Sequence, residues 1–149
     1  MKKLLMVFAT LLLAACSENS DFYRFNKAFG TGTFPVANDG QAALYIVREP
    51  AYPDAPAINI TVGRQPLVGL TAPNWVRLDL PPKLYDLRAY GTQTNSELII
   101  TVAPGQTRFL LAQPTPSGGA ELLELSQEQG RKLVRKGERM WTPEIDSEY

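Results

Sequence analysis

Few side chains in this sequence are of the types that perform chemistry. The 149 residues contain no histidine and one cysteine, Cys16. The absence of histidine excludes Ser-His-Asp and Cys-His nucleophile pairs, as well as histidine-based zinc and haem sites. A single cysteine forms neither an intramolecular disulfide nor a cluster of metal-binding thiolates. The chain therefore lacks the side chains that these kinds of active site require.

Carboxylates are the remaining candidates for acid-base or metal chemistry. The 15 acidic residues are scattered, and none of them belongs to a DxDxDG run of the kind that binds calcium. Asp79 and Asp86 fall in adjoining expected strands, while Glu121 and Glu124 share one strand. We interpret them as residues on solvated sheet faces, although a carboxylate or Ser-Lys pair assembled by the fold is left open. We expect a non-enzymatic protein with no catalytic residue, cofactor or metal site.

The strongest charge concentration lies near the C-terminus. Ser126 to Gln129 match a capping box, which predicts a helix that begins there and ends at Gly137 in a left-handed conformation. The cations are either a solvated helix face or a surface for an anionic partner, such as lipid headgroups, an acidic protein or a phosphate-bearing glycan. The whole chain carries 15 basic and 15 acidic residues, which gives no electrostatic case for nucleic acid. Five cations within nine residues form this candidate site: Arg131, Lys132, Arg135, Lys136 and Arg139.

The N-terminus has the layout of a secretory signal. Lys2 and Lys3 precede an apolar run over residues 4–13, and two alanines follow directly before Cys16. The run is too short for a bilayer span, which needs about 20 apolar residues. We therefore predict a signal peptide over residues 1–15.

The end of this segment, Leu-Ala-Ala-Cys, resembles the lipobox of bacterial lipoproteins. The resemblance implies that the Cys16 thiol is diacylated, that the signal is cut before it and that the new amine is acylated, for example with palmitate. An anchor of two or three acyl chains is stable, whereas one chain alone is marginal. Ser17 at the next position resembles an outer-membrane address on the periplasmic face. The alternative is an ordinary signal peptide followed by an incidental cysteine.

Residues 16–40 are expected to form the lipidated cysteine and a tether. Ser, Asn, Asp, Gly and Thr occur here without a sustained period, as in a linker. Five aromatic residues interrupt this composition, and Arg24 and Lys27 lie among them. These rings either dock on the domain, enter the headgroup layer beside the anchor, or bind a partner. They are Phe22, Tyr23, Phe25, Phe29 and Phe34.

Residues 41–141 are predicted to form one β-sandwich domain with a C-terminal helix, followed by a tail over 142–149. Short apolar or alternating segments are separated by turn residues, among them the Pro104-Gly105 pair, which is typical of a type II turn. The expected strands are 42–48, 58–62, 66–70, 75–80, 84–90, 97–102, 108–113 and 120–125. Alternation predicts a core of Ile58, Ile60, Val76, Leu78, Leu98, Ile100 and Phe109. The fold class is all-β: an antiparallel immunoglobulin-like β-sandwich of about seven to eight strands with a short C-terminal α-helix.

Several pieces in this order resemble a bacterial outer-membrane lipoprotein family of unknown function, similar to PEGA-type immunoglobulin-like sandwich domains. They are ALYIVRE, ITVGRQPLVGL, LPPKLYDLRAY, ITVAPGQTRFLL and ELLELSQEQGRKLV, over roughly residues 42–136. The chain departs from the family pattern at Pro81-Pro82-Lys83, where a Pro-Gly turn is usual. The resemblance implies a sandwich fold, and it supplies no activity or catalytic residue.

Two functions fit these observations. The first is a lipid-anchored periplasmic binding or structural module of the bacterial envelope, which is held to the membrane through Cys16 and contacts an envelope protein or glycan. The second is a β-sandwich lipoprotein component of a secretion or surface-assembly apparatus, similar to those of type VI secretion. In the second case the proline-rich residues 49–56 would be the recruiting loop.

Overall fold

The computed structural model describes residues 34–51 and 55–145. The chain divides into two compact units, residues 1–35 and 36–149. Phe34 and Pro35 are the described part of the first unit, so the account below concerns the second. The predicted signal peptide, Cys16 and the tether aromatics other than Phe34 lie outside the described residues.

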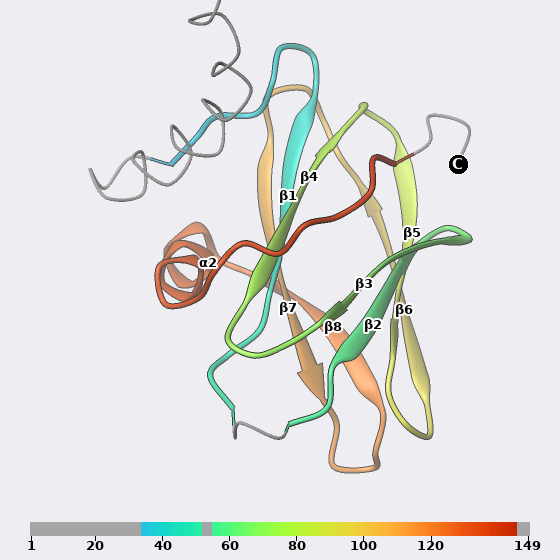
Figure 1. The fold of residues 1–149 in the computed structure, drawn as a ribbon. Coiled ribbons are helices and arrows are strands. Elements are labelled where there is room, and N and C mark those ends of the chain that lie inside the picture. The colour runs from blue at the N-terminus through green and yellow to red at the C-terminus, as the bar shows by residue number, and fades with distance from the viewer. Residues whose placement is uncertain (1–33, 52–54, 146–149) are drawn as a thin grey trace, which may run out of the picture. The chain divides into compact units, whose positions relative to one another are not determined.

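Eight strands in the described residues form two four-stranded sheets, and a short helix lies outside them (Figure 1). The strand order is β4-β1-β7-β8 in one sheet and β3-β2-β5-β6 in the other. The all-β sandwich expected from the sequence is confirmed. The elements are β1 (Ala42–Val47), β2 (Ile58–Val62), β3 (Gln65–Leu70), β4 (Trp75–Leu80), β5 (Leu84–Tyr90), β6 (Asn95–Thr101), β7 (Thr107–Pro114), β8 (Ala120–Leu125) and α2 (Gln127–Val134).

The strand positions follow the apolar alternation closely. In β2, Ile58 and Ile60 are buried while Asn59 between them is exposed, because successive side chains of a strand point to opposite faces. Turn residues determine where the strands end. Gly105 has φ +72° and the Gln106 amide donates to the Ala103 carbonyl at 3.1 Å, as in the predicted type II turn.

One strand pair corrects the expectation of a wholly antiparallel sandwich. β1 pairs antiparallel with β4 and parallel with β7. Parallel neighbours require a long connection between them, and here that connection is the chain from β2 to β6. The other strand pairs of the two sheets are antiparallel.

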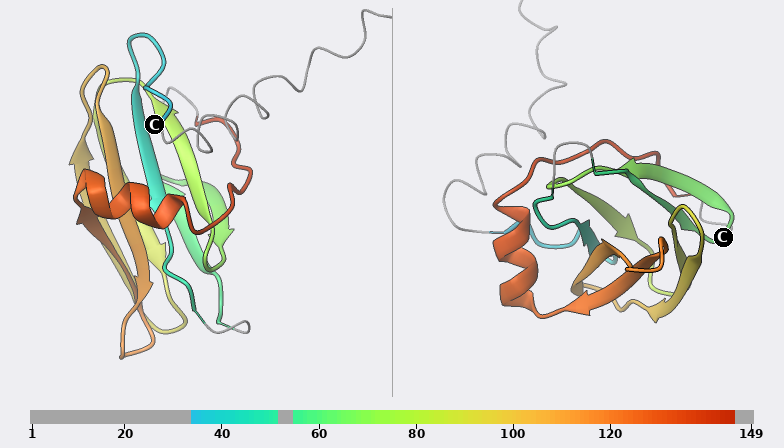
Figure 2. Two further views of the ribbon diagram at one scale, coloured as in Figure 1. Left: turned by 90° about the vertical axis from the view of Figure 1, so that its left-hand side faces the viewer. Right: turned by 90° about the horizontal axis from the view of Figure 1, so that it is seen from below.

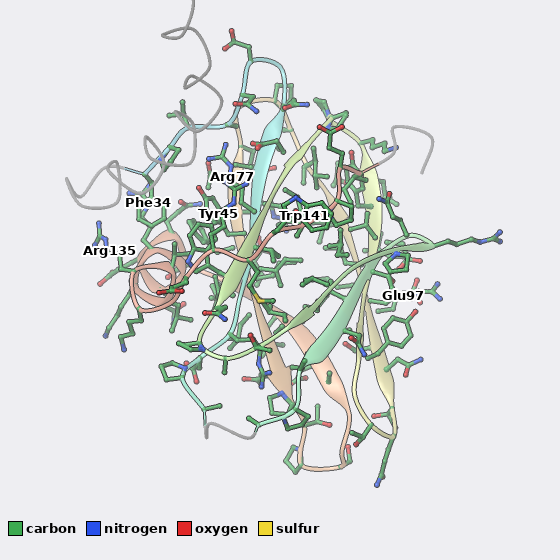
Figure 3. The ribbon with its side chains drawn as sticks, in the orientation of Figure 1. Phe34, Tyr45, Arg77, Glu97, Arg135 and Trp141 are labelled. Carbon is green, nitrogen blue, oxygen red and sulfur yellow. The ribbon has the colours of Figure 1, made fainter. Side chains whose placement is uncertain are left out.

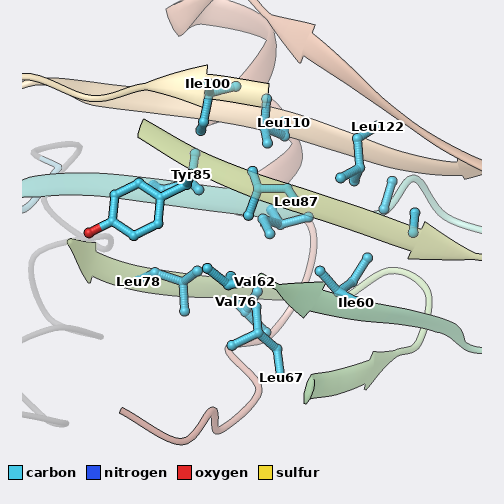
Figure 4. Packing of buried hydrophobic residues seen from close by; sticks show 14 of the residues in the cluster. Ile60, Val62, Leu67, Val76, Leu78, Tyr85, Leu87, Ile100, Leu110 and Leu122 are labelled. Atoms are coloured by element: carbon cyan, nitrogen blue, oxygen red, sulfur yellow. The ribbon is translucent and has the colours of Figure 1, made fainter. Parts of the chain in front are cut away.

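The main core lies between the two sheets (Figure 4). Of the seven predicted core residues, Leu98 is half-buried and packs against this core, and Phe109 is a correction. Phe109 is fully buried, but it lies on the opposite face of its sheet, beneath α2, because the alternation of β7 sends Leu110 inward. The five predicted residues that are buried in this core are Ile58, Ile60, Val76, Leu78 and Ile100.

A second apolar layer lies between α2 and the outer face of the β4-β1-β7-β8 sheet, which the helix crosses (Figure 2). The Tyr45 ring stacks on Phe109 with centroids 4.9 Å apart and contacts Trp75 at 5.7 Å. The helix contributes Gly130 and Val134, which are buried one turn apart. This layer explains why β1 is apolar on both of its faces.

The N-terminus of α2 is as predicted, and its C-terminus is not. Ser126 caps the helix, and both hydrogen bonds of the capping box with Gln129 are present. The helix ends at Val134, the C-cap Arg135 is right-handed, and Gly137 is not among the glycines with positive φ. Glycine is needed at 137 for a different reason. A Cβ there would lie 1.9 Å from the Pro73 carbonyl oxygen.

The segment after the helix, residues 138–145, pairs with the free edge of β4 at its first residue, Trp75. The Trp75 amide donates to the Glu138 carbonyl at 3.0 Å, and the Met140 amide donates to the Trp75 carbonyl at 2.8 Å. Met140 and Ile145 pack against the main core. The segment therefore occupies the edge of β4 at Trp75 and limits its pairing with other chains there. The packed part of the chain continues past residue 141.

Candidate functional site

The cationic face of α2 is the site that the sequence pointed to. Arg131, Lys132, Arg135 and Lys136 are all exposed, whereas Gly130 faces the sheet. Residues three and four apart lie on the same side of a helix, which groups Arg131, Lys132 and the C-cap Arg135. Lys136 follows directly and borders the same shallow surface depression, so the four cations form one surface. Figure 3 shows Arg135 on the side of α2 that faces away from the sheets. We call Arg131, Lys132, Arg135 and Lys136 the cationic face.

The fifth predicted cation, Arg139, lies apart from the cationic face. It follows the end of α2 and pairs with Trp75 through a parallel β-bridge. Burial lowers the pKa of Arg139, and repulsion from Arg77 lowers it further, while Asp79 acts in the opposite direction. The helix ends at Val134 with Arg135 as its C-cap, so Arg139 falls outside the helix and the nine-residue cluster of the sequence is split in two.

Arg139 belongs to a polar network on the outer face of β4. Arg77, which is buried, donates to Asp79 Oδ1 from Nη2 at 2.6 Å and to the Tyr45 hydroxyl from Nη1 at 3.2 Å. Its Nη2 also donates to the carbonyl of Val36 at 3.0 Å. Figure 3 shows Arg77 beside Tyr45. The network therefore ties the chain entering β1 to the outer face of the sheet.

This network lines a cleft of about 520 Å³, and its charges are largely compensated. The cleft walls carry two arginines, Arg77 and Arg139, and two acids, Asp79 and Glu144. Burial raises the pKa of the Tyr45 hydroxyl, so this phenol stays protonated at neutral pH and is not an activated nucleophile. The arrangement is that of a structural network rather than an acid-base site.

Sequence reasoning missed two buried arginines. Arg77 stands at an outward position of an alternating strand, which predicts a solvated side chain, yet it is 5 % exposed. Arg48 follows the apolar run of β1 and is 2 % exposed. The sequence feature that could have predicted this burial is the apolar character of both faces of β1. A strand that is buried on both sides needs a covering layer on each side.

Two further properties of the described residues bear on function. Within residues 34–51 and 55–145, no three His, Cys, Asp or Glu side chains come together in a way that suits a metal ion. No helix in the same part of the chain has the length and apolar character needed to cross a membrane.

Comparison with models of known protein families and with curated proteins finds no match for this chain. Its relationship to a lipoprotein family stays a prediction from the sequence.

Proposed function

We propose that this protein is a lipid-anchored, non-catalytic binding or structural module of the bacterial cell envelope, held through Cys16 on the periplasmic face of the outer membrane. The observation that carries the proposal is the cationic face of α2, which concentrates four exposed cations on one surface of a chain with 15 basic and 15 acidic residues. Its partner is an anionic envelope surface, namely lipid headgroups or phosphate-bearing glycans.

The construction of α2 supports a role in surface binding. The capping box fixes the start of the helix, and Gly130 seats it directly on the Phe109 ring, so the cations stand on a rigid support. Lys132 and Lys136 take part in none of the ion pairs among the described residues. Their charges are therefore available to an anionic partner, and at neutral pH such contacts are attractive and sensitive to salt.

Chain length also favours this arrangement. Nineteen residues separate Cys16 from the second compact unit, which begins at Val36. Fully extended, they span at most about 65 Å. An anchored domain is thus confined near the membrane surface, where even weak contacts of the cationic face are strengthened by a high effective concentration.

Binding of vesicles tests the cationic face. The mature chain with Cys16→Ser, which removes the acyl anchor, is cosedimented with phosphatidylcholine vesicles with and without phosphatidylglycerol. We expect binding to the anionic vesicles that weakens several-fold in the Lys132→Gln/Lys136→Gln variant and fades as salt rises, because exposed charges are screened within about 8 Å at 0.15 M salt.

A matched control is the Arg64→Gln/Lys83→Gln variant, which removes the same charge away from α2. Equal loss of binding in the two variants would mean that net charge alone is responsible. Salt-independent binding, or binding that Lys132→Gln/Lys136→Gln leaves unchanged, would remove the cationic face from the proposal.

Lipidation is tested separately in cells. Cys16→Ala removes the thiol that the anchor requires, so we expect an uncleaved or mislocalised precursor that leaves the detergent phase on partitioning. Partitioning of the variant equal to that of the wild type would refute the anchor, whatever the vesicle experiment shows.

A further inference from the structure

A second cleft lies at the end of the sandwich opposite the β6–β7 turn. The β5–β6 and β7–β8 connections and the described residues 48–51 and 55–57 after β1 meet there, at the lower end of the molecule in Figure 1. The cleft has a volume of about 450 Å³, within the range of small-ligand pockets. Its walls are mostly alanine, proline and glycine, with Thr92 and Gln113 as neutral polar groups.

One wall of this cleft, made by the β5–β6 and β7–β8 connections, is fixed by contacts between these two loops. Thr92 Oγ1 and the Gln93 amide both donate to the Gly118 carbonyl, each at 2.9 Å. A Cβ on Gly91 would lie 2.3 Å from the carbonyl carbon of Gly119, so the two backbones touch directly. This wall of the cleft is therefore preformed, which lowers the ordering cost of ligand binding.

Arg48 lines the cleft and is 2 % exposed. Its side-chain hydrogen bonds are both donated by Nη1, to the carbonyls of Pro56 at 2.8 Å and Leu70 at 3.1 Å. Nε is buried and has no hydrogen-bond partner. None of the ion pairs among the described residues includes Arg48, and burial lowers the pKa of this guanidinium.

The charge of the other buried arginine of the domain, Arg77, is compensated by its neighbours. Nη2 of Arg77 lies 2.6 Å from Asp79 Oδ1, and its Nη1 lies 3.2 Å from the hydroxyl of Tyr45. Arg48 has two neutral carbonyls and an unsatisfied nitrogen, although a guanidinium keeps its charge in proteins. A buried charge without a counter-ion is costly, so the cleft is electrostatically arranged to receive an anion.

We propose that this cleft binds a ligand with one carboxylate and a small apolar body, with the carboxylate on Arg48. The carboxylate supplies the negative charge that Arg48 lacks, in a charge-assisted contact of the strongest kind that arginine makes. The apolar body lies against the alanines and prolines. Glu49, which is the acid among the described lining residues, disfavours ligands with further negative charge. The inference does not depend on the proposed envelope function.

The carboxylate could belong to a free aliphatic acid or to a peptide C-terminus, and titration with small probes distinguishes the two. The probes are hexanoate and N-acetyl-alanyl-alanine, which represent a free aliphatic acid and a peptide C-terminus, together with hexanamide and the dipeptide amide. The mature chain with Cys16→Ser is titrated and followed by amide chemical shifts. We expect saturable shifts at Ala57, Thr92 and Gly119 with at least one acid, and an affinity at least about tenfold lower for the matching amide.

Two variants assign the effect to the cleft. Arg48→Met removes the charge at similar length, and Ala57→Trp fills the cleft from an exposed lining position while keeping Arg48. Each should lower the affinity for the acid at least about tenfold, and Ala103→Trp, in the turn at the other end of the domain, should not. If Arg48→Met does not fold, Ala57→Trp and the acid-amide comparison decide. Equal binding of acid and amide, no saturable shift with either acid, or unchanged affinity in Ala57→Trp would overturn the proposal.

Discussion

Replacing Gly130 by alanine tests how α2 is seated on the sheet. At an exposed position inside a helix this change stabilises the protein by about 1 kcal/mol, because alanine is the better helix former. Here the new Cβ would lie 2.1 Å from Cγ of Phe109 and 2.4 Å from its Cβ. Carbon atoms in contact lie about 3.5 to 4.0 Å apart, so the helix must move outward by about 1.5 Å.

The ring itself has little freedom to move aside. Phe109 is fully buried and stacks on Tyr45 at 4.9 Å, and the outward shift of the helix would also uncover Val134, which is 2 % exposed. Overpacking of this kind costs about 1 to 3 kcal/mol, and part of the burial energy of Val134 is lost as well. After subtraction of the helix-propensity gain, we expect Gly130→Ala to lower the free energy of unfolding by about 1 to 3 kcal/mol.

Urea denaturation followed by tryptophan fluorescence measures this change. Lys132→Ala, at an exposed position of the same helix, should alter stability by less than about 0.5 kcal/mol. In the Phe109→Leu background the penalty of Gly130→Ala should shrink by at least about 1 kcal/mol, because the two residues are in contact. If Gly130→Ala is as stable as the wild type or more so, the packing of α2 described above is wrong.

Two further predictions concern the outer face of the same sheet. Burial raises the pKa of Tyr45 above its ordinary value of 10.0, so the unfolded chain loses this proton at a lower pH than the folded chain. We therefore expect the stability that Tyr45 contributes to be complete below about pH 10 and to fall at higher pH. A Tyr45→Phe variant whose stability in urea titrations falls just as steeply above about pH 10 would contradict this. Truncation after Gly137 removes the two hydrogen bonds to Trp75 and the packing of Met140 and Ile145. We expect the free energy of unfolding to fall by about 2 to 4 kcal/mol and the truncated protein to self-associate on size exclusion. The control Trp141→Ala changes an 81 % exposed side chain of the same segment and should alter neither stability nor association.

Much of the fold was determined by local sequence. The strands β2, β4, β5 and β8 have the bounds expected from alternation and turn residues, because a period of two and a turn signal are both read within a few positions. The start of α2 is equally local, since the capping box of Ser126 and Gln129 needs only four residues. Arg131, Lys132 and the C-cap Arg135 share one side of the helix for the same reason, through helical spacing.

The tertiary structure decided what each face of a strand meets. The sequence pattern predicted Phe109 in the main core and Arg77 on a solvated face, whereas the packing of α2 and the covering segments buries both residues on the outer face of their sheet. The parallel pairing of β1 with β7 and the separation of Arg139 from the helix depend on partners far along the chain. Gly137 is likewise fixed by a close approach to Pro73 rather than by its own backbone angle. Spacing along the sequence gives periodicity and caps, whereas the burial of a charge such as Arg48 depends on which distant segments fold over it.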